Sequence, residues 1–125
     1  MEKKVRPHKN LEVWKESIQL IKMIYRLCPD LPSDEKFGLI SQMKRASVSV
    51  SLNISEGAAR RSDKEFHQFL TISSGSLSEL DTLIEVVLEL GFIDIKIYED
   101  FIRQINKVTA LLNGLMRIIA LKIRK

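Results

Sequence analysis

Residues 37–69 read FGLISQMKRASVSVSLNISEGAARRSDKEFHQF, and the conformation of this stretch decides the fold. Within it, Ser47–Ser55 alternates polar and apolar residues, which is the pattern of a half-buried strand. The same stretch also fits a helix, because apolar side chains recur at three- and four-residue spacing: Leu39, Met43, Ala46, Val50 and Ile54. Serine and valine favour a strand by propensity, so the flanking segments must settle the choice.

The segment before this stretch has the pattern of an amphipathic helix. Asn10 is a suitable N-cap, and a broad apolar stripe runs from Leu11 to Cys28. Pro29 ends that helix, and Ser33 or Asp34 is predicted to cap the next one.

The segments after the stretch are also helical. Gly57 interrupts the second helix, and Ser62-Asp63-Lys64-Glu65 has the form of a capping box that starts a third. The third helix is predicted to close at Leu90-Gly91, with glycine just past its end, and to admit a close backbone approach at Gly75. Asp94 is the predicted N-cap of a fourth helix that keeps helical spacing to Ile123.

Helices therefore flank the ambiguous stretch on both sides, and a lone strand between them would have no pairing partner. We predict an all-α fold, an antiparallel up-and-down bundle of four helices. Residues 1–10 are predicted to form a flexible basic arm, and residues 11–125 a single bundle domain.

Composition places the chain among soluble globular proteins. It has 125 residues, of which 45% are hydrophobic and 29% charged, and its single cysteine fits a reducing compartment. The first ten residues lack the apolar core of a signal peptide, and no uncharged run is long enough to cross a bilayer. We expect a cytoplasmic protein without a membrane partner.

The net charge of +4 is unevenly distributed along the chain. Residues 1–10 carry +3, residues 34–61 carry +2, residues 62–91 carry −5 and residues 92–125 carry +4, while residues 11–33 are balanced. This asymmetry favours self-association or a charged partner. The alternative is that the charges only solvate the exposed helix faces.

The residues typical of an active site are missing. Bundles that bind two iron ions carry paired Glu-x-x-His motifs, and this sequence has none. Its histidines, His8 and His67, form no ligand cluster with Cys28, which is expected to pack in the core. Phosphate-binding glycine loops and nucleophile elbows are absent too. We predict no enzymatic activity, cofactor, metal or small-molecule substrate.

Polar residues among the apolar ones on the second and third helices form a candidate network. An unpaired polar group inside a bundle costs about 1–3 kcal/mol, so such groups must find partners. Glu56 or Glu79 is predicted to meet Arg60 or Arg61, within a subunit or between subunits. A network that fixes register or a subunit interface is favoured over a ligand site, and its predicted members are Asn53, Glu56, Ser76 and Glu79.

Basic residues near the Gly57 break are candidates for nucleic-acid binding. Arginine pairs beside a helix N-terminus suit phosphate contacts. The predicted RNA-binding residues are Lys44, Arg45, Arg60, Arg61 and Lys64, joined by Lys3, Lys4, Arg6 and Lys9 of the arm. No aromatic residues interleave with them in the sequence, so stacking of single-stranded bases is poorly supported. Solubilising surface charge is the alternative.

Together these motifs resemble the four-helix-bundle family encoded within intervening sequences of bacterial 23S ribosomal RNA genes. The resemblance covers nearly the whole chain, through Asn10–Trp14, Glu35–Leu39, Gln42–Ala46, Asn53–Gly57, Arg60–Ser62, Lys64–Phe66, Gly75–Leu77, Glu79-Leu80, Leu90–Phe92 and Leu112–Leu115. It implies a bundle that assembles into a ring, typically a homopentamer, with no known enzymatic activity and an association with ribosomal RNA. The family often has proline where this chain has Ser51, so the resemblance does not imply a proline kink in the second helix here.

Two functional hypotheses follow. The first is a non-enzymatic, ring-forming bundle that binds RNA or a ribonucleoprotein through basic loop and tail residues. The second is a protein-interaction scaffold or accessory subunit whose charges serve self-assembly and which does not bind nucleic acid.

Overall fold

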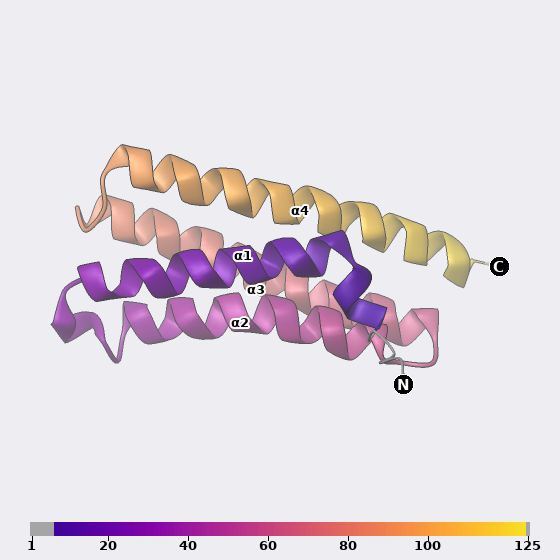
Figure 1. The fold of residues 1–125 in the computed structure, drawn as a ribbon. Helices are drawn as coiled ribbons and strands as arrows, with labels where there is room; N and C mark the ends of the chain where they lie inside the picture. The colour runs from indigo at the N-terminus through magenta and orange to yellow at the C-terminus, as the bar shows by residue number, and fades with distance from the viewer. Residues whose placement is uncertain (1–6, 125) are drawn as a thin grey trace, which may run out of the picture.

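The structure, a computed structural model, describes residues 7–124, and in that range it contains helices and no strand. The ambiguous stretch is helical, as the flanking segments predict (Figure 1). Four long helices and three short 3-10 helices follow one another: η1 (Pro7–Asn10), α1 (Glu12–Leu27), η2 (Cys28–Asp30), η3 (Ser33–Glu35), α2 (Leu39–Ala58), α3 (Asp63–Glu89) and α4 (Ile95–Ile123).

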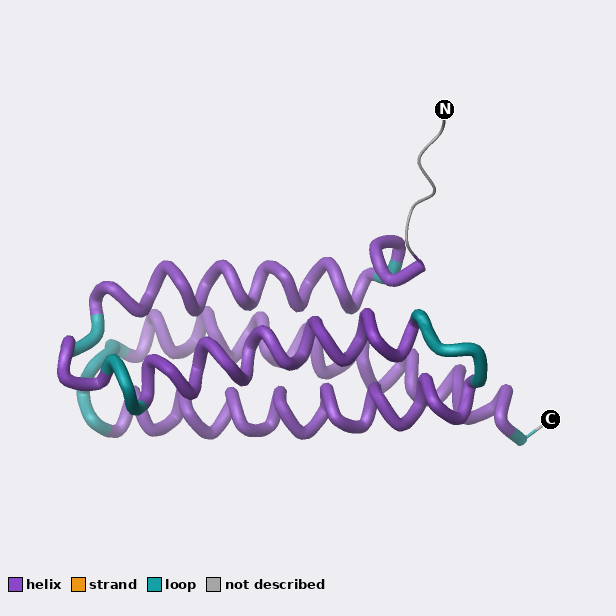
Figure 2. The backbone as a smooth tube through the Cα atoms, turned by 90° about the horizontal axis from the view of Figure 1, so that it is seen from below, coloured by secondary structure: helices purple, strands orange, loops and turns teal. Residues whose placement is uncertain are grey.

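The long helices form a four-helix bundle around one apolar core. Contacts join α1 to α2, α2 to α3, α3 to α4 and α4 back to α1, so each helix has two neighbours. The α2–α3 turn, η1 and the last turns of α4 lie at one end of the bundle, while the α1–α2 connection and the α3–α4 turn lie at the other (Figures 1 and 2). Among the described residues, no helix is long and apolar enough to cross a membrane.

The serine segment of α2 faces the core through both apolar and small polar residues. Val50 and Ile54 are fully buried, and Ser47 and Ser51 are buried beside them. The hydroxyl groups of Ser51 and Ser17 of α1 share a hydrogen bond of 2.6 Å. The small side chains of Ser17 and Ser51 leave room for α1 to pack against α2, and their two buried hydroxyl groups are hydrogen-bonded to each other.

Three predicted helix ends are confirmed. Ser62 caps α3 by accepting a hydrogen bond from the Glu65 amide at 3.1 Å, and Asp94 caps α4 by accepting one from the Ile97 amide at 2.9 Å. Gly91 follows α3 with φ of 78°, and the Phe92 amide donates to the Val87 carbonyl at 3.0 Å. This is a Schellman motif. It requires a residue in the left-handed conformation, which glycine adopts without strain.

Two predicted helix starts are wrong. Asn10 lies in η1, and Leu11 is the residue that precedes α1. Ser33 begins only the short η3, and α2 starts after Gly38. Residues 7–10 of the predicted flexible arm form this 3-10 turn, with the His8 ring 4.9 Å from the Trp14 ring; the rest of the arm lies outside the described residues.

Glu16 links α1 to α4. Its Oε1 accepts a hydrogen bond from Gln104 Nε2 at 3.0 Å and lies 3.3 Å from Lys107 Nζ. The hydrogen bond from Gln104 lowers the pKa of Glu16 below its ordinary value of 4.5, and the charge of Lys107 acts in the same direction, against the opposing effect of burial. The ionised carboxylate therefore holds the two helices together.

A pH dependence follows from this lowered pKa. Because the folded pKa lies below the unfolded one, the stabilisation is complete above the ordinary value of 4.5 and disappears as the pH falls through the folded pKa. We expect Glu16→Gln to lower the free energy of unfolding at pH 7 by about 1 kcal/mol or less. The difference from wild type should close in acid. Thermal melts of the wild type and the variant at pH 7 and in acid test this prediction, with the exposed Glu99→Gln as the control. A difference in stability that persists in acid would contradict it.

Candidate nucleic-acid interface

The turn between α2 and α3, the α2–α3 corner, brings the two helices into close contact. Gly57 lies in the last turn of α2, where a Cβ atom would come within 2.8 Å of both Phe66 Cδ1 and Phe69 Cβ. The absence of a side chain at Gly57 lets the two helices touch. No close approach occurs at Gly75 within the described chain, because nothing lies within 4 Å of a Cβ built there and the residue is exposed.

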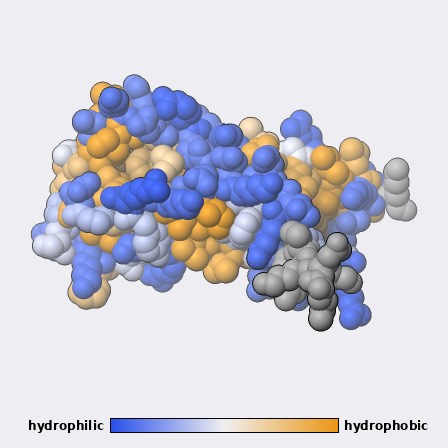
Figure 3. All heavy atoms as spheres, viewed as in Figure 1, coloured by the Kyte–Doolittle hydropathy of each residue, from blue (hydrophilic) through white to orange (hydrophobic). Residues whose placement is uncertain are grey.

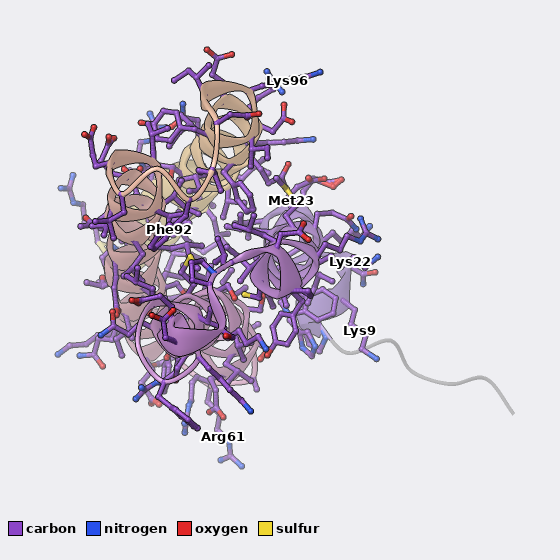
Figure 4. All side chains as sticks on the ribbon, turned by 90° about the vertical axis from the view of Figure 1, so that its left-hand side faces the viewer. Lys9, Lys22, Met23, Arg61, Phe92 and Lys96 are labelled. Carbon is purple, nitrogen blue, oxygen red and sulfur yellow. The ribbon has the colours of Figure 1, made fainter. Side chains whose placement is uncertain are left out.

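The arginines of this corner differ in how they are held. Arg60 forms an ion pair and a cation–π contact: its guanidinium lies 3.1 Å from Glu56 Oε2 and 4.8 Å from the centre of the Phe69 ring. Arg61 is exposed and points away from the bundle in Figure 4. Lys64 is exposed in the first turn of α3, and no carboxylate of the described residues forms a salt bridge with either cation. Arg61 and Lys64 are therefore available to an anion.

The other two predicted RNA-binding residues lie elsewhere on α2. Lys44 and Arg45 precede Arg60 by 15 residues or more, which corresponds to about 22 Å along a helix. Lys44 extends over the ring of Tyr25 at the end of α1, with its Nζ 4.8 Å from the ring centre. The five predicted residues thus form two groups, one at the corner and one on the outer face of α2.

The fold gathers further positive charge at the corner. The N-terminal turn and the last turns of α4 lie at the same end of the bundle as the α2–α3 corner (Figures 1 and 2). We call the exposed cations of these three segments the basic end: Lys9, Arg60, Arg61, Lys64, Arg117, Lys122 and Arg124.

The opposite end of the bundle is acidic. Residues 81–100, around the α3–α4 turn, carry six carboxylates and one lysine, Lys96. The Tyr98 hydroxyl donates to Glu85 Oε1 at 2.8 Å, and this hydrogen bond to a carboxylate raises the pKa of Tyr98. Charge is therefore separated along the long axis of the molecule.

The predicted polar network forms only in part. Asn53 Nδ2 donates to Ser49 Oγ at 3.1 Å, and Ser49 Oγ shares a hydrogen bond of 2.8 Å with Ser76 Oγ. Ser49, which joins the two predicted members, was missed; its position one turn before Asn53 was the available signal. Glu56 pairs with Arg60 outside this network, and Glu79 is exposed at the edge of the same α2–α3 groove as Arg45 and Ser76.

No catalytic arrangement emerges among the described residues. Cys28 is buried, and burial raises the pKa of its thiol, so the reactive thiolate is disfavoured at neutral pH. In residues 7–124, no three side chains of the His, Cys, Asp and Glu types gather as metal ligands. The arrangement of the site is electrostatic: exposed cations at one end of a helical bundle, suited to contacts with phosphates.

Comparison with known proteins agrees with this fold. A sequence model described as "23S rRNA-intervening sequence protein" matches residues 9–114. The chain is also similar to a crystal structure of a protein of unknown function from the S23 ribosomal protein family of Bacteroides thetaiotaomicron VPI-5482, with a TM-score of 0.78 and 23% sequence identity. That match covers 84% of this chain and 95% of the other. No curated protein matches.

Proposed function

Because this chain belongs to the 23S rRNA-intervening sequence protein family, we propose that it is a non-enzymatic RNA-binding protein whose antiparallel bundle assembles into a homo-oligomeric ring. Ribosomal RNA, alone or within a ribonucleoprotein, is the proposed ligand. The observation that carries the proposal is the basic end, where three segments distant in sequence bring seven exposed cations to one side of the molecule.

The basic end suits an RNA backbone better than a small anion. Its cations are spread over a surface instead of converging on one point, and backbone phosphates are spread in the same way. Arg61 and Lys64 lie on either side of the start of α3, whose first turn also carries the carboxylates of Asp63 and Glu65. The bound RNA is read through its backbone, with a strong dependence on salt.

Self-assembly is supported by the same charge separation. A basic end and an acidic end on one molecule attract each other between copies, and such a contact joins two different surfaces, as a ring requires. Exposed apolar side chains lie beside both ends: Leu90, Ile95 and Ile97 at the acidic end, and Ile118, Leu121 and Ile123 at the basic end. The family resemblance favours a pentamer.

Reversal of two free cations tests RNA binding. We expect Arg61→Glu/Lys64→Glu to weaken binding of labelled 23S ribosomal RNA fragments by about tenfold or more at low salt, measured by fluorescence anisotropy. The slope of log affinity against log salt should shrink by about 1.4–1.8, since each of the two lost phosphate contacts removes about 0.7–0.9. Arg60 is left intact because it also stabilises the corner.

The matched control carries the same charge change at the acidic end. Lys22→Glu/Lys96→Glu reverses two exposed cations that form no salt bridge among the described residues, and it also lowers the formal net charge by four, from +4 to 0. This variant should keep most of the RNA affinity. Equal loss in the two variants would mean that only net charge matters, and no loss in either would contradict the proposal.

The scaffold hypothesis gives a different result in the same experiment. A protein-interaction scaffold forms the oligomer, ignores RNA at every salt concentration, and changes its mass when the basic end is reversed. The anisotropy measurement separates the two functions, because the charge contact between copies makes a change of oligomer mass expected under both. Light scattering on the wild type and both variants follows that change of mass. The exposed apolar residues at both ends of the bundle support this second function.

A further inference from the structure

A groove on the outer face of α2 combines aromatic and basic side chains. It has a volume of about 580 Å³, within the range of small-ligand sites of about 300–1,000 Å³. Figure 3 shows apolar surface over the middle of the molecule, where α1 and α2 face the viewer. Its lining includes Tyr25, Lys36, Phe37, Lys44, Arg45 and Leu52. We call this surface the α2 groove.

Two aromatic rings of the α2 groove face solvent. Phe37, in the turn before α2, is 90% exposed, and Tyr25, near the end of α1, is 47% exposed. Burial of Phe37 therefore contributes almost nothing to folding, and its ring presents apolar surface to water. An exposed aromatic ring is an available stacking surface.

A cation accompanies each ring. Lys36 Nζ lies 5.6 Å from the centre of the Phe37 ring, and Lys44 Nζ lies 4.8 Å from that of Tyr25. No aspartate or glutamate lines the groove, and among the described residues none of its three cations forms a salt bridge. The groove therefore attracts an anion that also has a flat apolar face.

Nucleotides combine these two properties. A base stacks on an aromatic ring and its phosphate binds a neighbouring cation, which is how single-stranded nucleic acids are held without sequence preference. Bases in a duplex stack on one another and cannot reach such a groove, whereas unpaired bases can. The sequence predicted no aromatic platform beside the basic residues, because 18 residues separate Tyr25 from Lys44; the packing of α1 against α2 brings them together.

We propose that the α2 groove binds unpaired nucleotides of RNA, with bases stacked on Phe37 and Tyr25 and phosphates bound by Lys36, Lys44 and Arg45. This inference rests on the proposed RNA-binding function and adds its substrate class. The basic end binds the backbone of structured RNA, and the α2 groove, about 22 Å along the helix, selects a single-stranded segment.

Removal of one ring tests the proposal. The probe is labelled oligouridylate of about a dozen nucleotides, compared with a fully paired RNA duplex. We expect Phe37→Ala to weaken oligouridylate binding by about 5- to 100-fold, the usual effect of losing one stacked base, and to leave duplex binding unchanged. Phe37→Trp should restore the affinity, and its added tryptophan fluorescence should be quenched by oligouridylate beyond the signal of Trp14 in the wild type. Because Phe37 is exposed, these variants fold.

The controls keep this inference separate from the proposed function. Ile72→Ala removes an exposed apolar side chain of α3 that lies outside the groove lining, and it should have no effect on either RNA. If Arg61→Glu/Lys64→Glu weakens duplex binding while Phe37→Ala changes neither RNA, the α2 groove is refuted and the basic end stands. If the wild type binds neither RNA, both fail. If Phe37→Ala changes only the oligomer mass, the groove is a protein contact and the inference is wrong.

Discussion

Gly57→Ala is expected to destabilise the bundle by about 1–2 kcal/mol. A methyl group at this position would meet Phe66 Cδ1 and Phe69 Cβ at 2.8 Å and the Phe66 carbonyl oxygen at 3.2 Å. Two of these atoms belong to the backbone of α3 or are bonded directly to it, so relief requires the helices to move apart, and such overpacking costs about 1–3 kcal/mol. The higher helix propensity of alanine returns about 0.5–1 kcal/mol.

The same substitution at Gly75 provides the matched control. Gly75 also lies inside a helix, but a methyl group there has no neighbour within 4 Å. Only the propensity term applies, so Gly75→Ala should stabilise the protein by about 0.5–1 kcal/mol. Urea unfolding followed by circular dichroism measures both variants. Shifts in the same direction would show that helix–helix contact at Gly57 does not limit stability.

Ser51→Pro should destabilise the protein by about 3 kcal/mol or more. Ser51 is buried in the interior of α2, where proline removes one helical hydrogen bond and its ring clashes with the carbonyl four residues earlier. The hydrogen bond between the Ser51 and Ser17 hydroxyls is lost as well. The substitution therefore asks whether α2 of this chain tolerates a kink at this position.

Ser51→Ala separates the two contributions. It keeps the helical backbone and removes only the hydroxyl contact, which should cost about 1 kcal/mol. The difference between the proline and alanine variants is the cost of the backbone change. If both lose the same stability in thermal melts, α2 accommodates a kink at Ser51 and the backbone argument is wrong.

Helix ends were predictable where the signal was local. Ser62, Gly91 and Asp94 each act on backbone groups within five residues, so sequence spacing alone identified them. Asn10 and Ser33 have the same chemistry but do not cap a long helix. Asn10 lies in the 3-10 turn that places His8 on Trp14, and Ser33 lies in another before Gly38. Packing overrode propensity at these two positions.

Helical periodicity predicts which face of a helix a glycine lies on, but not which residues it contacts. Gly57 continues the buried stripe of Val50 and Ile54 at helical spacing, so its inward direction was readable from the sequence. Gly75 lies off the buried stripe of Ser73 and Leu77, and it is exposed. The direction of a glycine was thus available from the pattern, whereas the identity of its neighbours, Phe66 and Phe69, was set by the α2–α3 corner.

The sequence by itself determined the helical class, three of the helix ends and the residues that carry the charge, because these depend on interactions within one or two helical turns. Only the tertiary structure decided which of them act together. Packing brought the N-terminal turn, the α2–α3 corner and the end of α4 into one basic end, and placed Tyr25 under Lys44 in the α2 groove. Such contacts join residues far apart in the chain, and they form only when buried apolar faces align whole helices side by side.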